Sequence, residues 1–394
     1  MNDPHGLVHV NGMYHAFFQY VPRDTAWQSD LHWGHAISRD AVQWHHRGSA
    51  LVPADSEVGC WSGSLVIAEQ PTIFYTNPST DDWGRGQIVR AIGSADLSTW
   101  THDGVVIDGQ PEDRFRDFRD PQVRRSENGW TMVVGAGIRE DGGCVLQYSS
   151  ADLQTWTYDG VIVRAAYEPD AALNLGNVWE CPQFLNIDGA WVLMISAMVA
   201  GEKYQRQLYA IGDYDGRVFT PRKWGDYGHG DLPYATTTFM DAEGVSSAMS
   251  WLRETPETLP QGSPWAGALS IVHHLRIESD KLLAPFHPNL DAVLPAAPIS
   301  NTADVDFGTA VRFLGDARGT IVLRDAAHAV KIVFDTQRVT VFCDDESVLD
   351  ARCDDPTSLD LVADADWLEF VCGNVEGIFV AKIPPLGVGS ISNT

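Results

Sequence analysis

The chain has 394 residues, of which 44% are hydrophobic and 20% charged, a composition typical of a globular protein that excludes a disordered or fibrous one. Asp and Glu outnumber Lys and Arg by 53 to 27, and the formal charge of −26 repels phosphate backbones and anionic lipids. We therefore expect no nucleic acid partner and no membrane partner, and a small neutral molecule as the ligand.

A repeat of 56 residues organises the first part of the chain. The pattern Ser-x-Asp-x-x-x-Trp begins at Ser38, Ser94 and Ser150, and each copy lies beside short apolar runs. This is a hairpin signal, because Ser and Asp side chains cap turns through hydrogen bonds to the backbone. Repeats of this length with several short strands favour propeller blades over helical solenoids. We predict an all-β fold in which residues 1–285 form a five-bladed β-propeller catalytic domain, with an irregular β-sandwich as the alternative.

The remainder of the chain has a different pattern. Residues 286–302 are rich in Pro, Ala and Asn and are predicted to be a linker. Residues 303–394 then alternate apolar and polar side chains in short runs separated by Asp-rich turns. Such alternation without a helical period predicts a C-terminal β-sandwich.

A second periodicity, offset from the first, carries polar residues. Asp3, Ser62, Asp120, Glu180 and Tyr234 follow one another at intervals of 59, 58, 60 and 54 residues. Residues one repeat apart occupy equivalent places in successive blades. All five side chains are therefore expected to point into one central funnel.

Three of these five residues are carboxylic acids. Crowded carboxylates push one another's pKa values apart, so that one group keeps its proton beside another that is ionised. A protonated and an ionised carboxyl at one bond are the signature of glycoside hydrolysis. Taken singly, Asp3 and Asp120 would be turn caps before proline and Glu180 a surface residue. Indole faces stack on sugar rings, and four tryptophans lie near these motifs: Trp27, Trp33, Trp61 and Trp179.

The motifs resemble those of glycoside hydrolase family 32, the invertase and fructanase family. Residues 2–6 resemble its N-D-P-N-G motif, with His5 in place of Asn, and residues 61–64 resemble F-S-G-S, with Trp61 in place of Phe. The R-D-P and E-C-P motifs match residues 119–121 and 180–182, and weaker likenesses lie at residues 19–20, 33–36 and 368–371. The resemblance covers nearly the whole chain and implies a five-bladed propeller followed by a β-sandwich, in agreement with the repeats.

The resemblance also implies roles for individual residues. Asp3 would be the nucleophile, Glu180 the general acid and base, and Asp120 the group that stabilises the transition state. No metal and no organic cofactor would be needed. The substrate-binding residues would be Asn2, Gln19, Trp27, Trp61, Ser62, Arg119 and Asp226.

The implied activity is that of a retaining, exo-acting β-fructofuranosidase, which releases terminal β-D-fructofuranosyl units from sucrose or short fructo-oligosaccharides through a covalent fructosyl-enzyme. Three alternatives stay open: a fructosyltransferase on the same scaffold, an arabinan-cleaving propeller, and an inactive carbohydrate-binding homologue. The sequence leaves open the leaving group (sucrose, sucrose phosphate, inulin or levan) and whether the protein is a monomer or a homo-oligomer.

The ends and the cysteines of the chain bear on its location. Residues 1–4 lack the basic and apolar regions of a signal peptide, and no stretch reaches the roughly 18 apolar residues of a membrane span. The cytoplasm is the expected location as the chain is written, and an extracellular location would require a leader upstream of Met1. The six cysteines form no C-x-x-C pair and are expected to be reduced and buried.

Overall fold

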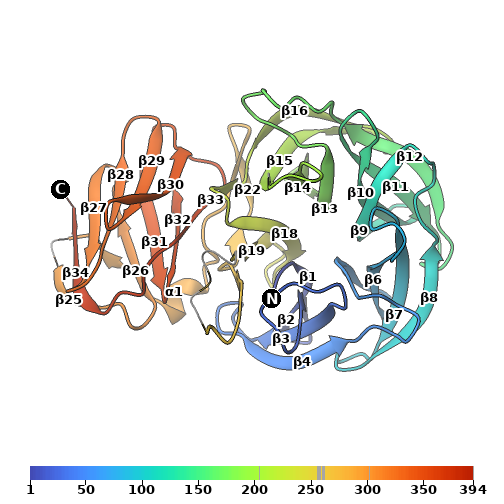
Figure 1. The fold of residues 1–394 in the computed structure, drawn as a ribbon, viewed down its shortest axis with the longest axis horizontal. Helices are drawn as coiled ribbons and strands as arrows, with labels where there is room; N and C mark the ends of the chain where they lie inside the picture. Colours follow the sequence, from blue (N-terminus) through green and yellow to red (C-terminus); the bar gives the residue numbers. More distant parts are fainter. Residues whose placement is uncertain (204, 255–258, 260–261, 301, 394) are drawn as a thin grey trace.

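The computed structural model describes residues 1–203, 205–254, 259, 262–300 and 302–393. Within these residues the protein is almost entirely β-structure, arranged as a ring of sheets beside two further sheets (Figure 1). The ring is a five-bladed β-propeller and the two further sheets form a β-sandwich, so the predicted fold class is confirmed. No helix in the described part of the chain is long and apolar enough to span a membrane.

Each of the first four blades is a four-stranded antiparallel sheet whose strands follow one another in the sequence, starting with the strand nearest the centre of the ring (Figure 1). Blade 1 contains β1 (Pro4–Val10), β2 (Met13–Tyr20), β3 (His32–Ser38) and β4 (His45–Leu51). Blade 2 contains β5 (Gly63–Ile67), β6 (Pro71–Pro78), β7 (Gly86–Gly93) and β8 (Trp100–Ile107). Blade 3 contains β9 (Phe115–Ser126), β10 (Gly129–Ile138), β11 (Gly143–Ser150) and β12 (Thr157–Arg164). Blade 4 contains β13 (Val178–Ile187), β14 (Ala190–Met198), β15 (Gln205–Tyr214) and β16 (Phe219–Asp226).

The repeated Ser-x-Asp turn joins the third and fourth strands of blades 1 to 3. In blade 3 the Ser150 hydroxyl donates to Asp152 Oδ1 at 3.1 Å, and the same oxygen accepts the backbone N–H of Thr155 at 2.9 Å. These bonds hold the turn in place, as expected from the side chains alone. The residue after each aspartate has a left-handed backbone, with φ of 60°, 60° and 64° at Ala41, Leu97 and Leu153.

The fifth blade is less regular than the others. Its first two strands, β18 (Pro233–Met240) and β19 (Ser246–Leu252), are long, and β19 then pairs with two short strands, β20 (Ala268–Leu269) and β21 (His273–His274). The ring closes where β18 contacts β1 of the first blade. A small hairpin follows, made of β22 (Arg276–Glu278) and β23 (Lys281–Leu283).

The sandwich consists of two six-stranded sheets within the described residues. One sheet has the order β17 (Gly228–His229), β33 (Ile378–Lys382), β32 (Trp367–Cys372), β31 (Leu359–Asp364), β26 (Val311–Gly315) and β24 (Ala297–Pro298). The other has the order β25 (Thr302–Asp306), β34 (Val388–Asn393), β27 (Gly319–Arg324), β28 (Ala329–Phe334), β29 (Arg338–Cys343) and β30 (Glu346–Arg352). Alternate side chains of both sheets, such as Ile321, Ile332 and Phe370, are buried between them.

The propeller and the sandwich share a packed junction. Strand β17 follows the fourth blade in the sequence but pairs in parallel with β33 of the sandwich. Buried apolar side chains of both parts pack in one cluster there, among them Leu275 and Ile378. The predicted linker 286–302 contains the short helix α1 (Leu290–Val293) and the strand β24. The boundaries of the domains themselves stay a prediction.

Candidate active site

A cavity of about 680 Å³ lies where the first residues of the inner strands meet. All three predicted catalytic acids, Asp3, Asp120 and Glu180, line it, together with Tyr234. The predicted binding residues Asn2, Gln19, Trp27, Trp61 and Arg119 line it as well. Lining residues that the sequence analysis did not single out are Leu31, Trp83, Asp117, Gln205, Trp251, Arg253 and Glu254.

The inner strands of blades 3 to 5 present their side chains at a β-bulge. Strand pairing is interrupted directly after Arg119, Glu180 and Tyr234, where two residues of the inner strand face one residue of its neighbour. The residue that follows each of them has a left-handed backbone, with φ of 62° at Asp120, 46° at Cys181 and 47° at Ala235. Arg119, Glu180 and Tyr234 are thus equivalent positions, and Asp120 is equivalent to Cys181. The expected equivalence of Asp120 and Glu180 is wrong by one residue, because Asp120 follows the bulge position in blade 3 whereas Glu180 occupies that position in blade 4.

Asp3 immediately precedes β1, and its carboxylate is held by hydrogen bonds. The Ser62 hydroxyl donates to Asp3 Oδ2 at 2.5 Å, and the Cys181 thiol lies 3.7 Å from the same oxygen. Burial raises the pKa of Asp3 to about 6, with a further rise from the charge of Glu180, while the Ser62 hydrogen bond acts in the opposite direction. Asp3 is therefore ionised only above a mildly acidic pH.

Asp120 is buried beside both other acids. Its Oδ2 accepts the backbone N–H of Cys181 at 2.9 Å, and its own N–H donates to Thr76 Oγ1 at 2.8 Å. Burial and the charge of Glu180 raise the pKa of Asp120 to about 7, and Asp3 adds to this rise, while Arg119 opposes it. This acid, like Asp3, retains its proton to a higher pH than an exposed aspartic acid would.

Glu180 accepts two strong donors, one on each carboxylate oxygen. Arg119 Nε donates to Oε1 at 2.9 Å, and the Tyr234 hydroxyl donates to Oε2 at 2.5 Å. Arg119 also binds Asp117 Oδ1 at 3.2 Å. The Glu180 side chain is thereby fixed in orientation by residues of blades 3 and 5.

A chain of side-chain hydrogen bonds connects the remaining predicted residues to Asp3. Asn2 Nδ2 donates to Gln19 Oε1 at 2.7 Å, Gln19 Nε2 donates to the Ser62 hydroxyl, and Ser62 in turn donates to Asp3. Asn2, Gln19 and Ser62 are each 9% exposed or less, and Asp3 is half-buried. This wall of the cavity is therefore preorganised before any ligand enters.

Aromatic side chains form one rim of the cavity. The Trp61 and Trp83 rings are stacked, with centroids 5.6 Å apart and an interplanar angle of 11°, and Trp27 meets Trp61 edge-on at 5.8 Å. Trp27 is 58% exposed and Trp83 is 47% exposed, so both offer ring faces to a ligand. Trp33 and Trp179, which also lie near the motifs, are fully buried and belong to the core.

Two predicted binding residues do not line the cavity. Ser62 is buried and contacts the lining residues Asp3 and Gln19. Asp226 lies elsewhere. Asp226 ends β16, the outer strand of blade 4, and its carboxylate forms an ion pair with Arg206. The family resemblance alone suggested this residue, and no repeated spacing supported it.

Arg253 is the cavity residue that sequence reasoning missed most clearly. Its Nε donates to the carbonyl oxygen of Asp231 at 2.9 Å, and its guanidinium carbon lies 5.1 Å from the centre of the Tyr234 ring. It forms no ion pair with a carboxylate in the described part of the chain. Arg253 follows no recognisable motif, so only the fold reveals that it faces Glu180 across Tyr234.

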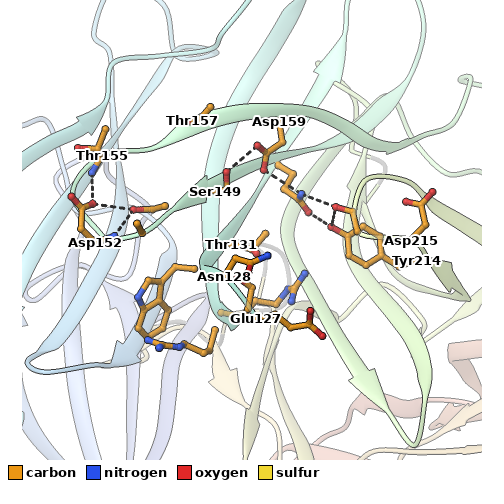
Figure 2. Close-up of a pocket in the computed structure, with 18 of the residues that line it drawn as sticks. Glu127, Asn128, Thr131, Ser149, Asp152, Thr155, Thr157, Asp159, Tyr214 and Asp215 are labelled. Carbon is orange, nitrogen blue, oxygen red and sulfur yellow. Dashed lines mark hydrogen bonds between the residues drawn. The ribbon is translucent and has the colours of Figure 1, made fainter.

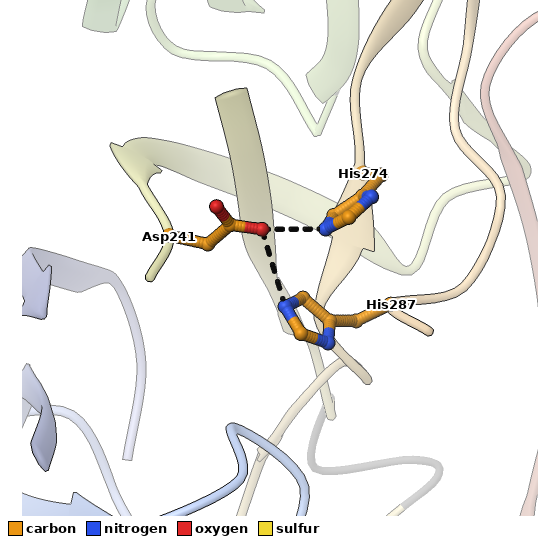
Figure 3. A group of neighbouring side chains, drawn as sticks. All are labelled: Asp241, His274 and His287. Carbon is orange, nitrogen blue, oxygen red and sulfur yellow. Dashed lines mark hydrogen bonds and ion pairs between the residues drawn. The ribbon is translucent and has the colours of Figure 1, made fainter. Parts of the chain in front are cut away.

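A second group of titratable side chains, Asp241, His274 and His287, has the composition of a metal site (Figure 3). His274 Nε2 lies 2.6 Å and His287 Nε2 3.4 Å from Asp241 Oδ2. However, His287 Nδ1 accepts the backbone N–H of Asn289 at 3.2 Å. A neutral imidazole has one acceptor nitrogen, so Nε2 carries the proton and faces the carboxylate as a donor. These contacts fit a hydrogen-bonded cluster that stabilises the β18–β19 turn better than a set of metal ligands.

Comparison with protein families agrees with this geometry. The model of the glycosyl hydrolases family 32 N-terminal domain matches residues 1–285. The chain belongs to glycosyl hydrolase family 32.

The chain is similar to family 32 proteins that are named for different fructosyl substrates. A raffinose invertase of Escherichia coli is 34% identical over 292 residues, which cover 69% of this chain and 59% of the relative. A levanase of Bacillus subtilis is 35% identical over 314 residues, covering 71% of this chain and 43% of the relative. A β-fructofuranosidase structure from Bombyx mori superimposes with a TM-score of 0.80 at 26% identity, covering all of this chain and 88% of that one. The chain thus spans less than two thirds of the invertase and of the levanase.

Proposed function

We propose that the protein is a retaining, exo-acting β-fructofuranosidase that hydrolyses terminal β-D-fructofuranosyl units of sucrose or short fructo-oligosaccharides. The observation that carries the proposal is the meeting of Asp3, Asp120 and Glu180 in one cavity of a family 32 protein. Relatives named raffinose invertase and levanase support a fructosyl substrate.

The chemistry divides between two of the acids. Glu180 donates a proton to the glycosidic oxygen while Asp3 attacks the anomeric C2 of the fructosyl unit, and the leaving sugar departs. A covalent fructosyl-enzyme results. Glu180, now ionised, takes a proton from water, which attacks C2 and releases fructose with the original configuration.

Arg119 and Tyr234 position Glu180 for both proton transfers. Their two hydrogen bonds leave little freedom to the carboxylate, and each can loosen as the carboxyl gains its proton. Asp120 lies beside Asp3 through the shared Cys181 contact, where its oxygens can bind fructosyl hydroxyls. Hydrogen bonds to hydroxyls that strengthen in the transition state contribute several kcal/mol in enzymes of this class.

The shape of the cavity supports action at a chain end. Buried Asn2 and Gln19 form one wall beside Asp3, whereas the exposed faces of Trp27 and Trp83 are at the rim. A terminal fructosyl unit would occupy the inner part, and the leaving sugar would stack at the rim. The protein needs no metal or organic cofactor for these steps.

A phosphorylated leaving group is a second candidate because of Arg253. The acidic composition of the chain disfavours anions, but Arg253 lies in the cavity beside Tyr234 and forms no ion pair with a carboxylate in the described residues. The leaving group would lie next to the general acid Glu180. Arg253 packs on Tyr234, which donates to Glu180, so Arg253 is on the leaving-group side of the cavity. Relatives named sucrose-6-phosphate hydrolase occur in Escherichia coli and Zymomonas mobilis.

The test is release of fructose from a panel of sucrose, sucrose 6-phosphate, 1-kestose, inulin, levan and an aryl arabinofuranoside. We expect the wild type to release fructose from sucrose or 1-kestose, and Asp3→Asn to lose at least about 10⁴-fold in kcat, because it removes the nucleophile. Hydrolysis of the arabinoside alone would overturn the proposal. Oligosaccharides in place of free fructose at high sucrose would identify a fructosyltransferase instead.

A further inference from the structure

A second hollow, of about 930 Å³, lies away from the catalytic cavity on blades 3 and 4. Three hairpin turns border it: the β9–β10 turn at Glu127 and Asn128, the β11–β12 turn that contains Asp152, and the β15–β16 turn at Asp215. Figure 2 shows Asn128 and Glu127 facing Ser149 and Asp159 across the hollow. Volumes of this size are typical of cavities that bind small molecules.

The Arg124 side chain lines the hollow, and its guanidinium group packs against aromatic rings. The guanidinium carbon of Arg124 lies 4.8 Å from the centre of the Trp191 ring and 5.9 Å from that of Tyr214. Arg124 Nε has no hydrogen-bond partner in the described part of the chain, although it is buried. Stacking on the rings orients the guanidinium, which presents a fixed positive charge to the hollow.

One wall of the hollow holds an exposed carboxylate in place with neutral donors. Ser149 Oγ donates to Asp159 Oδ1 at 3.0 Å, and Gln147 Nε2 donates to Oδ2 at 3.3 Å. Gln147 is 5% exposed and is itself bound by the Tyr214 hydroxyl. Asp159 is therefore a fixed acceptor whose negative charge no cation within 4 Å neutralises among the described residues.

Blade 2 treats the equivalent position differently, in a neighbouring hollow of about 970 Å³ that Arg90 and Asp103 line. Asp103 lies 56 residues before Asp159 and is likewise next to a glycine in the fourth strand. Arg90 and Gln147 are equivalent by strand register, because they pair with Gly104 and Gly160. Arg90 forms an ion pair with Asp103, whereas Gln147 leaves the charge of Asp159 in place.

The charges of the hollow indicate the class of ligand. Four carboxylates and two guanidiniums line it, so an anion is repelled on balance and a simple cation meets Arg124 and Arg125. Hydroxyl and amide groups of Asn128, Thr131 and Thr157 lie among them. A ligand that donates and accepts hydrogen bonds at many neighbouring positions, without net charge, matches this surface. A chain of sugar residues has that chemistry.

We propose that this hollow is a second carbohydrate-binding site, which holds a distant part of the polymer whose ends the catalytic cavity cleaves. The identity of the polymer as a fructan rests on the proposed function. The strand β9 carries both Asp120 and Arg124, about 13 Å apart along the chain at the rise of a β-strand. A polymer bound at the hollow keeps its ends close to the enzyme, which raises their effective concentration at the catalytic cavity.

The first experiment measures binding apart from turnover. Asp3→Asn protein runs through gels that contain levan or inulin, with saturating sucrose to fill the catalytic cavity. We expect the polymer to retard this protein. Adding Asn128→Ala and Asp159→Ala should weaken the retardation and raise the apparent Kd for the polymer by at least about fivefold. The matched control adds Asp103→Ala and should be retarded like the parent. Equal retardation of parent and double variant would overturn the site.

The second experiment uses the active enzyme. Asn128→Ala with Asp159→Ala should leave kcat/KM for sucrose unchanged and raise KM for the polymer about tenfold. An unchanged sucrose rate also shows that the variant is folded. A polymer KM equal to that of the wild type would overturn the tethering role.

Failure of the proposed function is distinguishable from failure of the site. If no fructoside is hydrolysed, the gels are repeated with arabinan, xylan and starch. Retardation that the double variant loses would support the site with another polymer, whereas no retardation by any polymer would overturn it.

Discussion

The catalytic cavity and the hollow on blades 3 and 4 treat acidic side chains in opposite ways. At the catalytic cavity Asp120 is buried, lies beside two other acids and has a pKa raised to about 7. At the hollow on blades 3 and 4, Asp159 is exposed and is held by the neutral donors Gln147 and Ser149. Burial makes an acid reactive by destabilising its charge, and exposure leaves it charged and suited to binding. Blade 3 therefore supports both arrangements, with Asp120 on β9 and Asp159 on β12, because the two sites differ in access to water.

The largest effect that would sharpen this comparison is expected at Glu180. Glu180→Gln keeps the size of the side chain but removes the proton donor, so kcat for sucrose should fall about 10³-fold. Fructosyl fluoride, whose leaving group needs no proton, should recover much of the first step. Asp159→Asn at the hollow is the matched control and should leave the sucrose rate within twofold, roughly. An equal loss of kcat for both substrates would contradict the assignment of the general acid.

A smaller effect is expected on stability from Asp120→Asn. The pKa of Asp120 is about 7 in the folded protein against 3.8 ordinarily, so the folded state binds the extra proton and loses stability as pH rises from about 4 to 7. The neutral amide avoids this penalty and still accepts the Cys181 N–H. We expect urea unfolding to show a gain of roughly 4 kcal/mol at pH 8 that vanishes at pH 4.

The control for this stability measurement has the opposite sign. Backbone hydrogen bonds from Thr155 and Gln154 lower the pKa of Asp152 in the exposed turn of blade 3. Asp152→Asn should therefore lose stability at pH 8, and the loss should disappear as the pH falls below the ordinary value of an aspartic acid. A gain at pH 8 for Asp152→Asn, or none for Asp120→Asn, would contradict this account of the two acids.

The smallest effect is a shift in pH dependence at Ser62. The Ser62 hydroxyl stabilises the ionised form of Asp3, so its removal raises the pKa of Asp3 above about 6. The acidic limb of kcat/KM should move up by about one pH unit in Ser62→Ala, with little change at pH 8. Ser64→Ala, in the same motif but bonded to the Val123 N–H, should leave the limb in place.

Sequence patterns predicted the ring and its acids because both depend on spacing. The Ser-x-Asp turns recur with identical backbone geometry at Ala41, Leu97 and Leu153. Spacing could not reveal the bulge that separates Asp120 from the position of Glu180, because one inserted residue resembles ordinary variation in repeat length. It also could not separate the buried Trp179 from the exposed Trp83, since that depends on packing from neighbouring blades.

Residues without a repeat were predicted least well. Arg253 comes from the fifth blade, whose outer part is irregular, and no motif marks it. Trp83 lies in a polar loop between β6 and β7. An isolated aromatic residue in such a loop was the one feature of the sequence that could have marked it as a ligand-binding residue. Asp226 was suggested by the family resemblance and its carboxylate is bound to Arg206 instead.

The bulge in the inner strands has a consequence for how this architecture diversifies. At the bulge, blades 3 to 5 each place a pair of consecutive residues beside the catalytic cavity: Arg119 with Asp120, both of which line it, and Glu180 with Cys181 and Tyr234 with Ala235, of which Glu180 and Tyr234 line it. Either member of a pair is open to substitution while the backbone that places the other stays fixed. The pair in blade 5 contains no acid, and its small buried Ala235 adjoins Tyr234 and Cys181. Ala235 is the member of that pair whose substitution would disturb the reacting groups least, because Tyr234 itself holds Glu180.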